Sequence, residues 1–262
     1  MYCRKNSSGQ WIIGNGNQPP VILSSAHCKS QFEAKKIAQT IDGFNIPLSE
    51  PTPGKGKIWF CMRFFLWISL ALSSMLNIYY FFRYGFPSGR WWLVPHESIL
   101  IDILLITVVG VVSTAIHEFG HMVFGRSWTV SAQILHRVIS TNLNHVWAWP
   151  RIRRIEAISA GLIFDSVLLS ALFAVQIIFD NAYAASAAST VCLRMVWQLG
   201  FHAIRDGRLL IVLTLDRPLF FSKPSNNGEY LLSFIFRLFG YAMDLFIIWQ
   251  WPIALTIGLL EV

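Results

Sequence analysis

Two histidines and a glutamate form the part of this sequence best suited to carry out chemistry. Residues 114–121 read Thr-Ala-Ile-His-Glu-Phe-Gly-His, so His117 and His121 stand four positions apart. On a helix, side chains at this spacing lie on one face, one turn from each other, where both imidazoles can bind a single Zn²⁺ ion. Glu118 would border that ion and could pass a proton from the hydrolytic water to a leaving amide nitrogen. The pattern predicts a zinc metallohydrolase centre of the HExxH type.

A catalytic zinc ion needs a third protein ligand and keeps its fourth position for water. Asp206 is the best candidate, because the membrane topology described below places it at the same face as His121. The competing interpretation of Asp206 is a loop carboxylate paired with Arg205 or Arg208. His202, one helical turn earlier, is a substitute ligand or a group behind the ligands. Asp165 is a further candidate, and the sequence leaves the choice among these open.

The composition places these residues in a membrane protein. Of the 262 residues, 54% are hydrophobic and 13% are charged, and the mean hydropathy is +0.50. We expect an all-α integral membrane fold with about five transmembrane helices, since each apolar stretch reaches the roughly 20 residues needed to cross a bilayer. The stretches cover residues 59–82, 98–126, 157–179, 184–204 and 231–260. The last is either one long tilted helix or a helix with an interfacial tail.

The distribution of Lys and Arg predicts how the chain crosses the membrane. Residues 1–58, 126–155 and 205–229 carry sixteen of these residues, whereas 83–97 carry two. By the positive-inside rule, the polar region 1–58 is cytosolic, and the spans beginning at 98 and 184 both run toward the cytosol. The basic residues lie in loops between apolar spans, which argues against a nucleic-acid partner despite a net charge of +7. The expected division is therefore a cytosolic region 1–58 and a membrane domain 59–262, with its core at 98–217.

Other ionisable residues inside the predicted spans include Asp102, Asp165, Arg194, Arg237 and Asp244. A charge there is either functional or paired with a neighbour. Besides its possible role as a ligand, Asp165 has a simpler interpretation as the partner of Arg194 between two helices.

Three segments resemble the site-2 protease family of intramembrane zinc metallopeptidases, especially its small bacterial members. Residues 115–121 match the HExxH helix of that family, and residues 159–165 resemble its central AGP-type segment, although Leu162 replaces the usual proline. Asp206-Gly207 resembles the DG motif, but the usual Asn-Pro upstream is missing from residues 199–203. The resemblance implies a three-helix metalloprotease core, Asp206 as the third zinc ligand, and a bacterial plasma membrane location.

The expected activity is endoproteolysis of a membrane-tethered protein or peptide, within or next to the bilayer. The alternative is a noncatalytic subunit of a peptide export or maturation system that keeps the metal as a structural staple. A membrane hydroxylase or desaturase is disfavoured because such di-metal sites need several histidine clusters, and this chain has seven histidines with one pair at ligand spacing. The sequence does not specify the substrate, the cleavage position or the oligomeric state.

Overall fold

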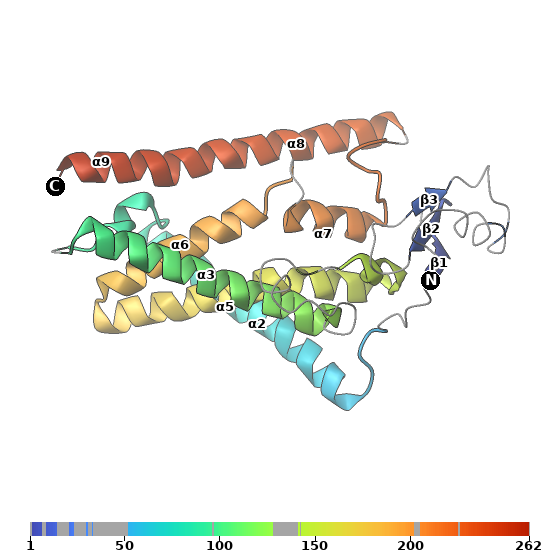
Figure 1. The fold of residues 1–262 in the computed structure, drawn as a ribbon, viewed down its shortest axis with the longest axis horizontal. Helices are drawn as coiled ribbons and strands as arrows, with labels where there is room; N and C mark the ends of the chain where they lie inside the picture. The colour runs from blue at the N-terminus through green and yellow to red at the C-terminus, as the bar shows by residue number, and fades with distance from the viewer. Residues whose placement is uncertain are drawn as a thin grey trace. The chain divides into compact units, whose positions relative to one another are not determined.

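The computed structural model of the chain is mostly helical, with three short strands at its N-terminus (Figure 1). The structure therefore supports the expected all-α fold, with these three strands as an addition that was not predicted. The structure describes residues 2–6, 9–14, 21–23, 30, 33, 52–95, 97–127, 141, 143–201, 205–224 and 226–261.

Among the described residues, four helices are long and apolar enough to cross a membrane, judged by length and composition. They are α2 (Lys57–Tyr84), α3 (Ile99–Gly125), α5 (Arg151–Phe179) and the continuous C-terminal helix Asn227–Glu261. Each covers one of the apolar stretches expected from the sequence, and α3 lacks only the first and last residue of its stretch. Long apolar helices of this kind are compatible with an integral membrane protein.

The fifth expected span is a shorter helix and is not among these four. Helix α6 covers Ala182–Gln198, 17 residues, instead of extending to residue 204. At 1.5 Å per residue it rises about 26 Å, less than the ~30 Å hydrocarbon thickness. It starts sharply because Asn181 caps it, accepting a hydrogen bond from the Ala184 backbone N–H at 2.9 Å.

The C-terminal helix contains a proline without being broken by it. Helix α8 (Asn227–Ile248) continues through a π-helical turn, η4 (Trp249–Ile253), into α9 (Ala254–Glu261). Proline lacks an N–H and crowds the preceding turn, and local widening to a π-helix accommodates both effects. Of the two expectations for this stretch, the structure shows the single long helix.

The N-terminal region contains a small antiparallel sheet that the sequence analysis missed. Strands β1 (Tyr2–Lys5), β2 (Trp11–Gly14) and β3 (Val21–Leu23) pair in the order β1-β2-β3. The sheet contacts the 3₁₀ helix η3 (Asn144–Ala148), and the side chains of Ile12 and Ile13 are fully buried. The sheet therefore packs on another part of the chain.

The chain divides into two compact units. One comprises Met1–Trp59, Glu118–Ala160 and Leu209–Ser233, and the other comprises Phe60–His117, Gly161–Arg208 and Phe234–Val262. Helix α3 passes without interruption from the second unit into the first, between His117 and Glu118. Residues on either side of that point therefore keep the spacing that helical geometry gives them.

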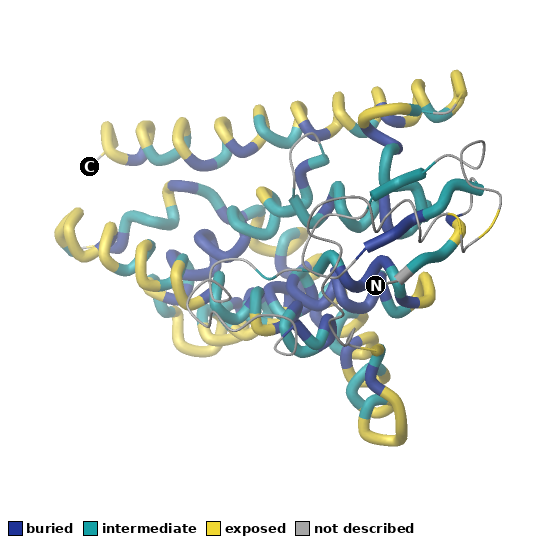
Figure 2. The backbone as a smooth tube through the Cα atoms, turned by 45° about the vertical axis from the view of Figure 1, so that its right-hand side comes forward, coloured by how far each residue is buried: buried dark blue, intermediate teal, exposed yellow. Residues whose placement is uncertain are grey.

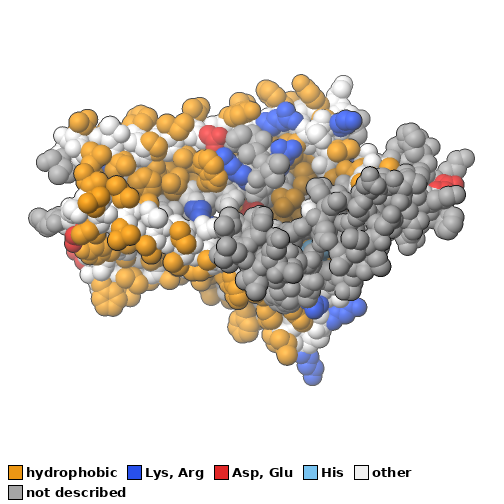
Figure 3. All heavy atoms as spheres, viewed as in Figure 1, with side chains coloured by type: hydrophobic (Ala, Val, Ile, Leu, Met, Phe, Trp, Pro, Cys, Tyr) orange, Lys and Arg blue, Asp and Glu red, His pale blue; other side chains and the backbone are white. Residues whose placement is uncertain are grey.

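The long helices expose many large apolar side chains. Phe82 of α2, Leu100 of α3 and Leu260 of α9 are 90%, 77% and 83% exposed. Figure 2 shows exposed residues recurring along the C-terminal helix, and Figure 3 shows hydrophobic side chains covering much of the described surface on the visible face. In water such a surface would be unfavourable, so it is typical of helices that face lipid.

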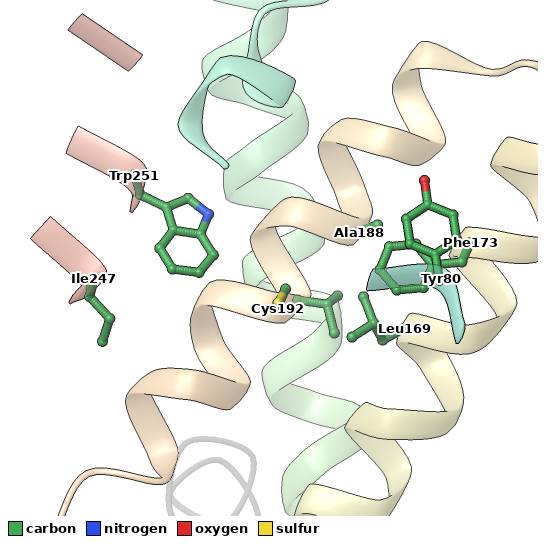
Figure 4. Close-up of a cluster of buried hydrophobic side chains, with 8 residues drawn as sticks. Tyr80, Leu169, Phe173, Ala188, Cys192, Ile247 and Trp251 are labelled. Carbon is green, nitrogen blue, oxygen red and sulfur yellow. The ribbon is translucent and has the colours of Figure 1, made fainter. Parts of the chain in front are cut away.

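The second unit has an apolar core in which α6 takes a central part (Figure 4). Ala188, Val191 and Cys192 of α6 are buried there with Leu169 and Phe173 of α5. Small side chains dominate the buried positions of α6, and this allows neighbouring helices to approach closely.

Candidate metal centre

The structure brings the three predicted ligands together. Ring nitrogens of His117 and His121 and a carboxylate oxygen of Asp206 all lie within 4.8 Å of one another. His117 Nε2 is 2.8 Å from Asp206 Oδ2, and the two histidine side chains are buried while Asp206 is partly accessible. Two imidazoles and one carboxylate at these separations form a donor set that suits a divalent cation such as Zn²⁺.

Both histidines use Nδ1 for a hydrogen bond to oxygen. His117 Nδ1 lies 2.7 Å from Asp165 Oδ2, and His121 Nδ1 lies 2.9 Å from the backbone oxygen of Ala157. A carbonyl oxygen can only accept, so His121 donates from Nδ1, and in the neutral imidazole Nε2 is the nitrogen that carries the lone pair. His117 has a carboxylate oxygen at each ring nitrogen, Asp165 at Nδ1 and Asp206 at Nε2, and oxygen partners such as Asp165 typically orient metal-binding histidines.

Asp206 owes its position to the start of a helix and to the glycine that follows it. Asp206 is the first residue of α7 (Asp206–Leu215), where a carboxylate interacts favourably with the helix dipole. The backbone of Leu199 passes so close to Gly207 that a Cβ there would meet the Leu199 carbonyl oxygen at 2.6 Å. Glycine at 207 therefore permits the close approach that brings Asp206 to His117.

Asp165 contacts His117 and is not one of the three grouped residues. It is fully buried, its Oδ2 faces His117 Nδ1, and its Oδ1 accepts a hydrogen bond from Arg194 Nη2. Asp165 and Asp206 thus contact opposite nitrogens of the His117 ring. The predicted pairing of Asp165 with Arg194 is present, and the contact with His117 accompanies it.

The sequence also offered Arg205 as a partner of Asp206 and His202 as a substitute ligand. Arg205, offered as a partner of Asp206, instead lies 3.3 Å from Asp244 and stacks over the Trp197 ring at 3.8 Å from its centroid. The substitute ligand His202 lies outside the described residues.

Glu118 is half-buried and directly follows His117 on α3. Its Oε2 accepts a hydrogen bond from the Thr141 backbone N–H at 2.8 Å. A carboxylate has two oxygens and about four acceptor sites, so this bond leaves Glu118 further capacity to accept a proton. Glu118 does not belong to the three-residue ligand group, which agrees with the role of base instead of ligand.

An ion cluster in the first unit was not expected from the sequence. Asp216 accepts hydrogen bonds from Arg4 of β1, at 2.9 and 2.5 Å, and from Arg154 of α5 at 2.5 Å. Burial alone would raise the pKa of Asp216, but the hydrogen bonds from both arginines outweigh it and hold that pKa below its usual value. Arg4 and Asp216 are 212 positions apart, and no local pattern signals such a pair.

The basic loop after α3 contributes a buried histidine. His145 of η3 is fully buried, with Nε2 2.6 Å from the backbone oxygen of Gly125, the last residue of α3. Burial lowers the pKa of His145, and the hydrogen bond to Gly125 offsets only part of that effect. His145 is therefore a packing residue at the end of the helix that carries His117 and His121, and His136 lies outside the described residues.

Comparison of the chain with protein-family models, with curated proteins and with solved structures finds no match.

Proposed function

We propose that this chain is a zinc-dependent endopeptidase of the HExxH type that cleaves membrane-tethered proteins or peptides within or next to the bilayer. The observation that carries the proposal is the convergence of His117, His121 and Asp206, with the His117 ring contacted by Asp165 and the His121 ring by the Ala157 carbonyl. Two nitrogens and one oxygen are a common donor set for catalytic zinc, which leaves its fourth position to water.

The charges around His117 also favour a divalent cation. Counted as ionised, Glu118, Asp165 and Asp206 carry three negative charges, and Arg194 carries one positive charge. A doubly charged cation makes this group neutral overall. Neutrality matters here because unpaired charges within an apolar span are unfavourable by several kcal/mol.

Zinc bound at this centre would act as a Lewis acid on the scissile carbonyl and would acidify the hydrolytic water. The chain itself would supply the base: Glu118 accepts a proton from the water and returns it to the amide nitrogen of the leaving strand. Asp165 and the Ala157 carbonyl would keep the two histidine rings in their orientation. A substrate helix would have to unwind first, because a helical amide is engaged in its own hydrogen bonds.

The proposal also includes a membrane topology. An N-terminus in the cytosol of a bacterial cell places the centre at the cytosolic end of α3, where water is accessible to an otherwise apolar helix. Helices α3, α5 and α6 would form the three-helix core of a site-2 protease-like enzyme, with α6 as a short fifth crossing largely covered by protein. The contact between His117 and Asp206 supports parallel α3 and α6, since Asp206 follows α6 in the chain.

The test combines metal analysis with a cleavage assay on purified protein. Glu118→Gln should keep one zinc ion per chain and lose peptidase activity by 10²-fold or more, because removing a general base costs about 10² to 10⁴ in rate. Asp206→Ala should lose the zinc itself. A parent protein that contains no zinc would contradict the proposal.

One observation favours the noncatalytic alternative, in which the metal only stabilises the fold of a subunit of an export or maturation system. The Thr141 backbone already occupies one oxygen of Glu118. In that case the parent would bind zinc, cleave no substrate, and support its partner system equally well with Gln at position 118.

A further inference from the structure

A chain of polar contacts runs from His117 to an arginine on a different helix. Asp165 of α5 uses one carboxylate oxygen for His117 Nδ1 and the other for Arg194 Nη2. Arg194, on α6, also donates from Nε to Ser113 Oγ at 3.1 Å, and Ser113 lies on α3 one turn before His117. The four residues belong to one compact unit and join three helices.

We propose that Arg194 is a positioning residue for the metal centre: through Asp165 it fixes the orientation of the His117 ring and thereby sets the affinity for zinc. This inference rests on the proposed function, because it concerns the same centre. It adds to that function a residue that no sequence pattern connects with zinc binding.

The two carboxylate oxygens of Asp165 have different partners, His117 and Arg194. A carboxylate can rotate about its terminal bond, so a single contact with His117 would leave the acceptor direction loosely defined. Arg194 holds the second oxygen and removes that freedom. Oxygen partners of metal-binding histidines affect metal affinity strongly, and their removal typically costs 10- to 100-fold.

The simpler explanation is that Arg194 and Asp165 form an ion pair that only joins α6 to α5. Arg194, however, makes more contacts than such a pair requires. An arginine whose side chain is only 14% exposed among apolar helices is unfavourable, and packing alone could be achieved with apolar side chains at lower cost. Arg194 instead contacts two helices, and both contacts lead toward His117. The apolar cluster of Figure 4 supplies the rigid packing: Val191 and Cys192 of α6 are buried beside Leu169 of α5, one turn from Asp165.

The experiment measures zinc affinity of the full chain in detergent. The protein is stripped of metal, and zinc is titrated against a chromophoric chelator. Arg194→Gln and Asp165→Asn should each weaken zinc binding 10- to 100-fold, and the double variant should be no weaker than the weaker single variant, because both changes break the same chain of contacts. Cobalt substitution provides a second readout, since a reoriented His117 changes the visible absorption spectrum of the bound ion.

A matched control separates positioning from general stability. Asn77 of α2 donates to the backbone and hydroxyl oxygens of Ser166, the residue next to Asp165, at 3.1 Å in each case. Asn77→Ala breaks a buried polar contact on the same helix, and it should lower the unfolding temperature while leaving zinc affinity within about twofold of the parent. Arg194→Lys, which keeps the charge, should retain more affinity than Arg194→Gln and serves if the glutamine variant does not fold.

The zinc titrations separate the positioning role of Arg194 from the hydrolase proposal. If the parent binds zinc and Arg194→Gln and Arg194→Lys bind it equally well, the positioning role is wrong while the hydrolase proposal stands. Additive losses in the double variant would also overturn it, because they indicate independent effects. A parent without affinity for zinc overturns both proposals.

Discussion

Replacing Asp216 by Asn is expected to destabilise the packing of the N-terminal sheet. The change keeps the shape of the side chain but removes the negative charge shared by Arg4 and Arg154. The Arg154 side chain is only 4% exposed, and that of Arg4 is 20% exposed. Removing one partner of a buried pair costs about 3–5 kcal/mol, and partial access of Arg4 to water places this case near 3 kcal/mol.

A loss of about 3 kcal/mol corresponds to a fall of roughly 6–12 °C in the unfolding midpoint of a chain near this size. The measurement is thermal unfolding of purified parent and variant at pH 7, with limited proteolysis of the N-terminal region as a local readout. Glu261→Gln is the control, because Glu261 pairs with Arg90 at an exposed position where such pairs contribute below about 1 kcal/mol.

The pH dependence provides an independent check on Asp216. Its pKa is lowered in the folded protein, so the unfolded chain binds the proton more tightly. The contribution to stability is therefore fully present above the ordinary value of 3.8 and is lost as pH falls toward the lower folded-state pKa. Asp216→Asn should lack this acid-dependent part. An Asn variant that melts within 2 °C of the parent at pH 7 would refute the reasoning.

Two further predictions concern the surroundings of the metal centre. Gly207→Ala should cost about 1–3 kcal/mol and weaken zinc binding by displacing Asp206, whereas Gly110→Ala, where an added Cβ meets nothing within 4 Å, should leave the zinc content unchanged; metal analysis of both variants tests this. His145→Gln should abolish a loss of stability that the parent shows as pH falls below 6.5, because the lowered pKa of His145 makes protonation favour the unfolded chain; unfolding midpoints between pH 5 and 8 test this, and an unchanged slope in the variant contradicts it.

Periodicity and charge explain why much of the helical framework was predictable. Long apolar stretches specify helices in a medium that cannot satisfy free backbone groups, so four of the expected spans coincide with long apolar helices. The Lys and Arg count placed Asp206 at the same face as His121, and the structure brings both into one ligand group. The length of helix α6 was overestimated, because hydropathy alone does not locate the end of the helix at Gln198.

Some features that depend on distant pairing were not predictable. Strands β1 and β2 have four residues each, too few for a clear alternation of apolar and polar side chains. The Asp216 cluster joins Arg4 to a residue near the other end of the chain, and only the folded protein brings them together. The opposite positions of Asp165 and Asp206 around the His117 ring likewise depend on side-chain geometry, which spacing along the sequence does not encode.

The two histidines differ in how easily mutation can disturb them. His117 depends on the side chain of Asp165, which a single substitution can remove, whereas His121 depends on the main-chain oxygen of Ala157, which every amino acid at that position would still provide. Random mutagenesis scored by loss of metal should therefore yield changes clustered behind His117 and few behind His121. Substitutions should therefore alter the centre more readily from the His117 side than from the His121 side.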